Sequence, residues 1–280
     1  MKSIKADLHI HTIYSPDSKQ GPEQIVRRAK KKGIGAVALC DHNTCESFNW
    51  ISENTDKDGV YQGIIVVPAC EISTDRGHIL GLFLKEPLNL DSLVSTDVYS
   101  YKDVHSAIKK AGGIVCAAHP FESVNVCTDY LSMVDCIEVY NARAASINDK
   151  ANSAAAVYAE KISKPYTAGS DAHILNEIGN AFLEVKLVEV SLLELKTAVL
   201  KGDGIVWGKE SSMRNRALSQ LIKQYKLKNE PALFKRILVL TFFCLIDLLK
   251  FAGLINKDKG TISMKEGNAH VSNSKDREKS

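Results

Sequence analysis

Two histidines, His9 and His11, stand two residues apart at the end of a predicted strand near the start of the chain. Alternate side chains of a strand point to the same face, so both imidazoles can reach one metal ion. Six of the eight histidines lie at predicted strand ends beside carboxylates, and His105 and His270 are the two exceptions. The remaining members of this set are His42, Glu71, His78, His119, Asp171 and His173.

The residue types in this set indicate which ions it would hold. Histidines and carboxylates without cysteine suit Zn²⁺, Mn²⁺ or Fe²⁺. The set is larger than one ion needs, which predicts two or three divalent metal ions, with Glu71 as the natural bridging ligand. The sequence has no G-x-S-x-G nucleophile motif and no Walker-type phosphate loop. The predicted chemistry is therefore metal-assisted.

Three further polar residues near the predicted strand ends each have two interpretations. Asp41 and Asp7 either orient a metal ligand through hydrogen bonds or are turn residues at strand ends. Arg143 either clamps a phosphate group with its guanidinium or is a solvated arginine. We treat Asp41 and Arg143 as candidate catalytic residues.

The elements that must position these residues alternate between strands and helices over about the first 209 residues. This alternation predicts an α/β fold with a parallel sheet or barrel. The candidate site residues follow the strands, where parallel α/β folds carry their chemistry. Strands are expected at residues 6–10, 34–40, 64–70, 78–84, 114–118, 135–139 and 165–168, and helices at 22–32, 101–111, 147–162 and 191–200.

Charge is unevenly distributed along the 280 residues. From residue 211 onward there are 14 Lys and Arg against 6 Asp and Glu, a net charge of +8, which leaves the first 210 residues at −5. This asymmetry predicts an acidic body and a basic extension. Seven cysteines without a C-x-x-C pair, and an N-terminus without an apolar segment, indicate a cytoplasmic protein.

Five ordered motifs give the first 209 residues a resemblance to a known family. The chain resembles the PHP (polymerase and histidinol phosphatase) family, in its general metal-dependent phosphoesterase branch. The resemblance implies a distorted, TIM-like (β/α)7 barrel with a trinuclear metal site at the strand carboxyl ends. The motifs are Asp7-Leu8-His9-Ile10-His11-Thr12, Asp41-His42-Asn43-Thr44, Glu71 with Gly77-His78-Ile79-Leu80-Gly81, His119-Pro120, and Gly169-Ser170-Asp171-Ala172-His173.

The resemblance also implies a ligand set for each of the three metals. An acidic residue after the first motif completes the third site in the family, where many members read H-T-x-x-S-D-G. In this chain Asp17 stands one residue later, after Pro16, so it is either that ligand or part of a turn that caps a helix. The first metal would be held by His9, His11, Glu71 and Asp171, the second by Glu71, His78 and His119, and the third by His42, His173 and Asp17.

The function that follows is metal-dependent hydrolysis of a phosphate ester by a metal-bridging hydroxide, with Asp17 as one candidate proton donor to the leaving oxygen. The expected substrate is a small phosphomonoester, a nucleotide or a short oligonucleotide, so nucleic acid is among the candidate substrates. The alternatives are a histidinol phosphatase, or a non-catalytic metal-binding regulatory module docked through its C-terminal helix.

The last 70 residues have a different character from the barrel. We expect three parts: a barrel over residues 1–209, a helical extension over 210–256 that the chemistry does not require, and a disordered polar tail over 257–280. Residues 235–255 are strongly apolar but contain Asp247 and Lys250. This segment could dock on the barrel or a partner protein, lie on a membrane surface beside basic flanks, or anchor the chain in a membrane. The basic helix expected over residues 214–228 could contact nucleic acid or anionic lipid.

Overall fold

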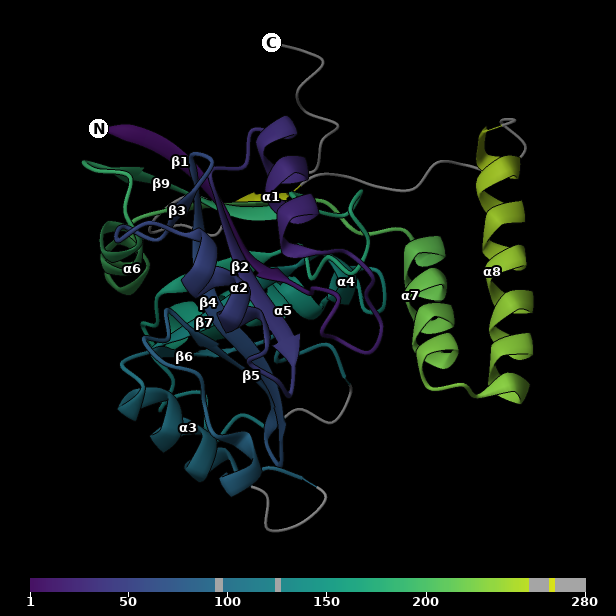
Figure 1. Cartoon of the computed structure of the whole chain (residues 1–280), viewed down its shortest axis with the longest axis horizontal. Coiled ribbons are helices and arrows are strands. Elements are labelled where there is room, and N and C mark those ends of the chain that lie inside the picture. Colours follow the sequence, from purple (N-terminus) through teal and green to yellow (C-terminus); the bar gives the residue numbers. More distant parts are fainter. Residues whose placement is uncertain (94–97, 124–126, 252–261, 265–280) are drawn as a thin grey trace.

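The computed structural model describes residues 1–93, 98–123, 127–251 and 262–264. One 11-stranded sheet dominates this part of the chain and curls into a barrel, with helices on its outside (Figure 1). Two helices at the C-terminal end stand to one side of the barrel. The structure confirms the predicted α/β barrel with a C-terminal helical extension.

Seven strands of the sheet form the nearly closed barrel. The end of β8 returns to β1, where the Ser170 amide donates to Asp7 Oδ1 at 2.9 Å and Ile10 forms a parallel bridge with Ala172. In spatial order the seven strands are β1 (Lys2–Ile10), β2 (Ala36–His42), β4 (Ile64–Thr74), β5 (Gly77–Leu82), β6 (Ile114–Ala117), β7 (Cys136–Asn141) and β8 (Tyr166–Gly169).

The sheet is mixed, whereas the sequence predicted a parallel one. β5 pairs antiparallel with both β4 and β6. Only Asp75 and Arg76 separate β4 from β5, and so short a connection can close a hairpin but cannot make a parallel crossover. The reversal brings His78, at the start of β5, opposite Ser73 near the carboxyl end of β4. His78 therefore lies at the same end of the barrel as the residues that follow the parallel strands.

Four strands were not predicted. β9 (Ala181–Leu187) pairs antiparallel with β1 and extends the sheet beyond the barrel, and β3 (Val60–Tyr61) pairs with β4. β10 (Ile205–Gly208) follows β9, and β11 (Ile262–Met264) pairs with β10. β11 lies within the segment predicted to be a disordered tail, and the rest of that segment is outside the described residues.

Helices cover the barrel and pack on its strands through their apolar faces. In α1 (Pro22–Lys31), proline occupies the first turn and the Gln24 side chain accepts from the Gly21 amide at 2.9 Å. The apolar residues of α1 pack with those of α2 (Ser47–Asn54) against β2 and β4 in one core cluster. A larger cluster joins the strands to the remaining helices of the barrel. They are α3 (Tyr101–Lys110), α5 (Ala151–Lys161) and α6 (Leu192–Lys201), and the short α4 (Ala142–Ala145) follows β7.

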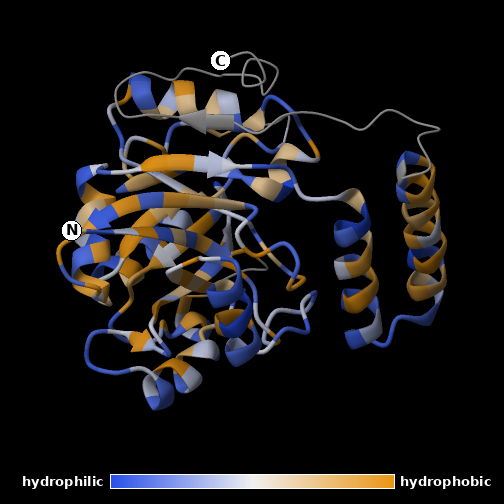
Figure 2. Cartoon of the chain, turned by 90° about the horizontal axis from the view of Figure 1, so that it is seen from above, coloured by the Kyte–Doolittle hydropathy of each residue, from blue (hydrophilic) through white to orange (hydrophobic). Residues whose placement is uncertain are grey.

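The C-terminal extension is a hairpin of two helices, α7 (Met213–Lys226) and α8 (Glu230–Phe251). The Ser212 hydroxyl caps α7 by accepting from the Asn215 amide at 3.3 Å. α7 lies between the barrel and α8 in both ribbon views (Figures 1 and 2). Among the described helices, none has the length and apolar character that crossing a membrane requires.

Candidate metal centre

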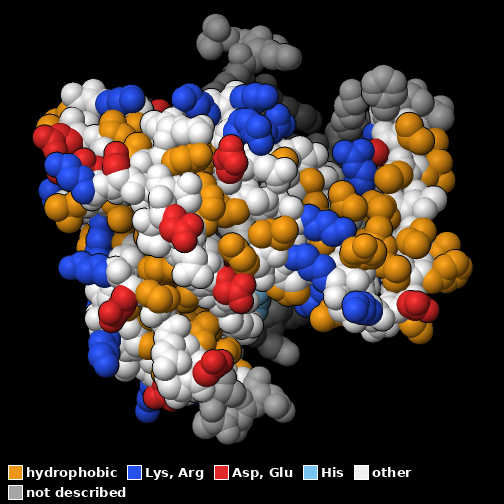
Figure 3. Space-filling view, in the orientation of Figure 1, with side chains coloured by type: hydrophobic (Ala, Val, Ile, Leu, Met, Phe, Trp, Pro, Cys, Tyr) orange, Lys and Arg blue, Asp and Glu red, His pale blue; other side chains and the backbone are white. Residues whose placement is uncertain are grey.

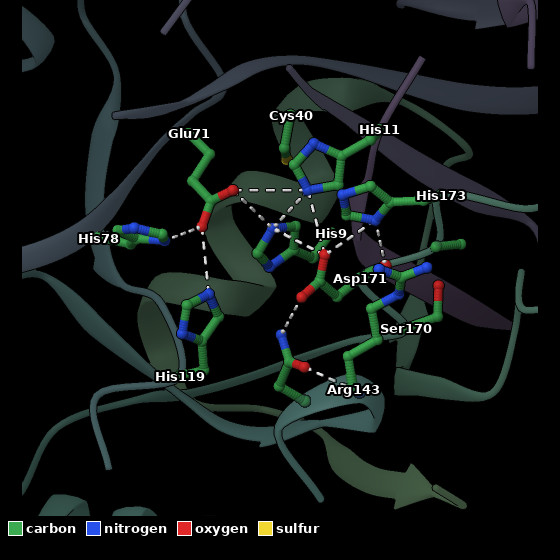
Figure 4. A network of polar contacts seen from close by, with 12 residues as sticks. His9, His11, Cys40, Glu71, His78, His119, Arg143, Ser170, Asp171 and His173 are labelled. Atoms are coloured by element: carbon green, nitrogen blue, oxygen red, sulfur yellow. Dashed lines mark hydrogen bonds and ion pairs between the residues drawn. The ribbon is translucent and has the colours of Figure 1, made fainter. Parts of the chain in front are cut away.

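The Glu71 carboxylate, near the carboxyl end of β4, lies at the centre of the predicted set (Figure 4). Its Oε1 lies 2.8 Å from His78 Nδ1 and 3.1 Å from His119 Nε2. Its Oε2 lies 2.8 Å from His42 Nδ1 and 3.4 Å from His11 Nε2. Histidines from four different strand ends thus converge on one carboxylate that is 1% exposed.

His9 and His11 point their Nε2 atoms toward the same point, 3.2 Å apart. Two ligands that each lie 2.0–2.1 Å from a tetrahedral ion are separated by about 3.3 Å. His11 Nε2 is also 3.1 Å from Asp171 Oδ1, and His9 Nε2 is 3.5 Å from Glu71 Oε2. The geometry of this pair therefore fits two ligands of one ion better than two isolated side chains.

A third group forms where the loop after β1 meets the ends of β2 and β8. His173 Nε2 lies 3.4 Å from His42 Nε2 and 3.2 Å from Asp17 Oδ1. Asp17 Oδ2 is 3.7 Å from His42 Nε2. Asp17 does not cap α1, whose N-cap is Gly21. Its carboxylate faces the two histidines with which the family resemblance grouped it.

Among the residues that the structure describes, three clusters of potential ligand atoms result, each with its atoms within 4.8 Å of one another. They share members, since Glu71 belongs to two clusters and His11 to two. His11 joins the third cluster, which the sequence did not predict. The clusters are His9 with His11 and Glu71, Glu71 with His78 and His119, and His11 with His42 and His173.

The surroundings of three carboxylate oxygens indicate whether these residues suit metal ions. Asp17 Oδ1, Glu71 Oε2 and Asp171 Oδ1 are buried, and within the described part of the chain none of them accepts a hydrogen bond. Each nonetheless lies within 3.2 Å of a histidine nitrogen. An ionised oxygen that is buried without a hydrogen bond is costly, and coordination of a cation removes that cost. The donor set therefore fits divalent ions.

The electrostatics of the cluster point the same way. Burial alone would raise the pKa of Glu71, but the imidazoles of His42 and His78 outweigh it and hold that pKa well below its ordinary value. Burial would likewise raise the pKa of Asp171, yet His9 keeps it well below its usual range. Burial would lower the pKa of His9, but Glu138 and the facing carboxylates raise it well above its ordinary value. The same ionised carboxylates that attract protons here would attract divalent cations.

Glu138, near the middle of β7, supports two of the predicted ligands and was missed by sequence reasoning. Its Oε1 lies 2.9 Å from His9 Nδ1, and its Oε2 accepts from the His119 amide at 2.8 Å. A carboxylate on the far ring nitrogen fixes the tautomer, so His9 Nε2 is free to coordinate. The available signal was a single charge inside the apolar run Cys136-Ile137-Glu138-Val139-Tyr140.

Asp41 and Asp7 act as anchors rather than as ligands in this structure. Asp41 accepts from the Thr12 amide at 2.7 Å and from the Ser15 hydroxyl at 2.8 Å, and Ser15 Oγ in turn lies 3.1 Å from His11 Nδ1. Asp7 accepts from the amide and the hydroxyl of Ser170, which precedes Asp171. Burial raises the pKa of Asp7 to about 6. Both aspartates thus orient ligand-bearing segments, which is the first of their two predicted interpretations.

The backbone near the candidate ligands adopts unusual conformations and packs closely, and both features help to bring the ligand side chains together. Asn43, His119 and Asp171 all adopt positive φ, at 51°, 29° and 53°, which L-residues seldom do. Gly169 allows β8 to approach β1 closely, because a Cβ there would stand 2.2 Å from His9 Cβ. Tight packing of strand ends therefore brings the ligands together.

Arg143 has a different role from either of the two predicted. Its Nε and Nη2 donate to the Glu177 carboxylate at 3.2 and 2.9 Å, and its Nη1 donates to Ser219 Oγ of α7 at 3.0 Å. The residue is 5% exposed, so it is not solvated. Because these nitrogens already bond protein groups, the guanidinium is not poised to clamp a phosphate. It joins α4 to the α7 helix.

A cavity of about 300 Å³ adjoins the Glu71 side of the cluster. His78 and His119 line it, together with Arg76 on the β4–β5 turn and Tyr130. Glu122 also lines the cavity, and its Oε2 lies 3.1 Å from His119 Nδ1. A small ligand in this cavity would contact two of the candidate metal ligands directly.

Two family models and several known proteins match this chain. The PHP domain family matches residues 7–114, and the PHP-associated family matches residues 149–203. An uncharacterized protein of Methanocaldococcus jannaschii is 37% identical over 152 residues, covering 50% of this chain and 82% of that protein. A second uncharacterized protein of the same organism is 29% identical over 231 residues, covering 76% of this chain and 86% of that protein.

Two further matches carry functional names. A 5'-3' exoribonuclease of Haemophilus influenzae is 39% identical over 82 residues, which is 28% of each protein. Among solved structures, a two-domain protein of Bacteroides vulgatus, described as containing a predicted PHP-like metal-dependent phosphoesterase, superposes with a TM-score of 0.59 at 20% identity. That likeness covers 74% of this chain and 65% of the other. The chain therefore belongs to the PHP domain family.

Proposed function

We propose that this protein hydrolyses the phosphate ester of a nucleotide-sized substrate, using two or three divalent metal ions. The observation that carries the proposal is the convergence of six histidines on three carboxylates, with one buried oxygen of each carboxylate accepting no hydrogen bond within the described part of the chain. Bound there, zinc, manganese or iron ions would lower the pKa of a water molecule and neutralise phosphate charge.

The residues of the chain would divide this work. Glu71 faces two of the clusters and would bridge the first two ions, while His9, His11 and Asp171 complete one site and His78 and His119 the other. His42 and His173 would hold the third ion with Asp17, whose pKa burial would raise but His173 holds below its ordinary value. An ionised Asp17 suits a ligand better than a proton donor. Glu138 and Asp41 would orient the ligands.

The size of the substrate is inferred from the cavity beside His78 and His119. About 300 Å³ is at the lower end of the range for small-molecule sites and suits a nucleotide or a similar phosphomonoester. Arg76 on its wall supplies a cation, although Asp129 pairs with it at 2.6 Å. The exoribonuclease relative supports a nucleotide unit, so the end of a short oligonucleotide is the natural second substrate.

A substrate panel tests the proposal. Full-length protein loaded with Mn²⁺ or Zn²⁺ should release phosphate from nitrophenyl phosphate and from nucleoside monophosphates, and short RNA and histidinol phosphate complete the panel. The His9→Ala variant should lose metal and activity together. His105→Ala, which removes a histidine of α3 outside the cluster, is the matched control and should keep both.

The results of this panel distinguish the proposed function from its alternatives. Turnover of short RNA far above that of mononucleotides would make the protein a nuclease. Preference for histidinol phosphate would establish the histidinol phosphatase alternative. Protein that contains metal but turns over no substrate with any metal would overturn the proposal in favour of a regulatory module.

A further inference from the structure

The outer face of α8 combines exposure with apolar side chains. Its exposed large residues follow one another at spacings of three or four positions, with one adjacent pair, which places them on one side of the helix. They are Phe234 (65% exposed), Ile237 (45%), Leu238 (57%), Phe242 (58%), Leu245 (54%) and Leu248 (64%). Within this stripe, which we call the outer face, Thr241 is the polar residue, and its hydroxyl donates back to the Ile237 carbonyl at 2.9 Å.

The outer face points away from the rest of the protein. α8 packs on α7, and α7 packs on the barrel, so α8 lies at the outer edge of the molecule (Figures 1 and 2). Apolar side chains cover this edge in the space-filling view, with basic residues between and beside them (Figure 3). From Phe234 to Leu248 the stripe extends about 21 Å at 1.5 Å per residue. A continuous apolar stripe of this length on a helix marks an interaction surface.

The charged residues of the hairpin are numerous and mostly positive. From Ser211 to Phe251 there are 8 Lys and Arg against 2 Asp and Glu, a net charge of +6. One acidic residue, Asp247, lies on the inner side of α8, where its carboxylate is 3.3 Å from Arg214 of α7. Lys228 and Lys235 are exposed near the start of α8. The partner should therefore offer an apolar layer beneath a negatively charged surface.

We propose that the outer face of α8 docks on the surface of a bilayer that contains anionic phospholipids. Acyl chains accept an apolar helix face, and anionic headgroups complement the +6 charge of the hairpin. Arg236, Asp247 and Lys250 lie within the same helix, and α7 is attached along its inner side. Burial of these groups in hydrocarbon would be costly, so the helix lies in the interface with its inner side toward water.

The charge of the hairpin also favours an anionic bilayer over a second copy of the chain as the partner. Pairing two outer faces would bring two hairpins of +6 charge together, and the repulsion would oppose the apolar contact. A polyanion such as RNA would match the charge but would leave the six apolar side chains in water. An anionic bilayer satisfies both features.

Vesicle co-sedimentation tests the proposal with the full-length protein. It should bind vesicles of phosphatidylcholine with phosphatidylglycerol, and bind those of phosphatidylcholine alone at least about tenfold more weakly. Leu238→Glu combined with Leu245→Glu should reduce binding to the anionic vesicles by roughly tenfold or more. The matched control is Val188→Glu with Leu193→Glu, at two apolar residues 70% and 74% exposed on the barrel, and it should bind like the wild type.

A second variant tests the electrostatic part independently. Lys228→Glu with Lys235→Glu keeps the outer face and should remove most of the preference for phosphatidylglycerol. Equal loss in the barrel control, no binding to either vesicle, or binding that ignores lipid charge would overturn the proposal. Loss of a dimer in Leu238→Glu/Leu245→Glu, measured by light scattering without vesicle binding in the wild type, would overturn it in favour of a second copy.

Discussion

The open end of the barrel and the C-terminal hairpin depart from the usual distribution of polar and apolar groups in opposite directions. At the barrel, carboxylates such as Glu71 and Asp17 are buried with an oxygen that accepts no hydrogen bond within the described residues. On α8, six large apolar residues are exposed. Both arrangements are unfavourable for the isolated chain, and each is relieved by a different kind of partner. Ions suit the first region and a lipid surface the second.

The two regions are nevertheless joined. Lys226 of α7 donates from Nζ to the carbonyls of Ile13 and Ser15, in the loop that leads to Asp17, with both bonds at 2.7 Å. Arg143 and Ser219 link α7 to α4 in the same way. The extension, which the sequence predicted to be dispensable for chemistry, thus contacts the loop at the rim of the candidate metal centre. The following variants separate what each region contributes.

The largest effect is expected at Glu71, which lies between two clusters. Glu71→Gln keeps the shape of the side chain but removes the charge that faces four histidines. Metal content should fall, and activity should drop by at least roughly a hundredfold, the upper end of what a supporting residue contributes. Mass spectrometry of bound metal and the phosphate-release assay measure both. Full metal content in folded Glu71→Gln protein would contradict the bridging role.

Gly169→Ala tests whether close strand packing creates the site. The added methyl would stand 2.2 Å from His9 Cβ and 2.8 Å from its backbone nitrogen, and the backbone of β1 cannot move aside easily. The free energy of unfolding should fall by about 3 kcal/mol or more. Urea unfolding measures it. The matched control is Gly21→Ala, where φ is −74° and a Cβ would meet only Gln24 Oε1 at 3.8 Å, and it should change the free energy of unfolding far less.

An intermediate effect is expected for Glu138→Gln. The amide could still meet His9 Nδ1, but it would not hold the tautomer with a charge. Metal affinity or activity should fall by roughly 10- to 100-fold while the fold is kept. Metal titration of the variant, together with its circular dichroism spectrum, checks this. An unchanged metal affinity would show that His9 needs no partner.

The smallest effect is expected at the junction of the two regions. Lys226→Ala removes both hydrogen bonds to the loop that leads to Asp17, which should lower activity by roughly a few-fold without loss of the first two ions. Lys223→Ala removes the same charge almost one turn earlier on α7 and serves as the control. Equal activity in both variants would mean that the hairpin does not support the centre.

Local pattern was enough to predict which side chains converge at one end of the barrel. Most of the predicted metal ligands lie in the last residues of a strand or in the loop that follows it. The ends of barrel strands meet at one edge, so His9 and Asp171 could be grouped from the sequence. Glu138 was missed because it lies in the middle of β7 rather than near its end, and because it contacts His9 through Nδ1 rather than facing the shared point. The role of Arg143 was predicted wrongly because its partner Glu177 is 34 residues away in the sequence. Local sequence patterns do not indicate contacts between residues so far apart.

The fold was predicted less completely than the site. The reversal of β5 was missed because the alternation of strands and helices predicts parallel strands, whereas the two residues that follow Thr74 can only close a hairpin. β9 alternates buried and partly exposed residues at Ala181–Leu187, a pattern of period two that indicates a half-covered strand. The packing of α7 depends on side chains such as Asn215 and Ser219, whose polar character resembles that of a solvated face.

The central claim is that side chains far apart in the chain jointly hold several cations. Anomalous diffraction from crystals grown with Mn²⁺ tests it most directly, because the signal locates each ion without reference to activity. We predict peaks on both sides of Glu71, within coordination distance of His9 and His11 on one side and of His78 and His119 on the other, and a third peak beside His173. Crystals that bind manganese elsewhere, or show no peak next to Glu71, would contradict the account.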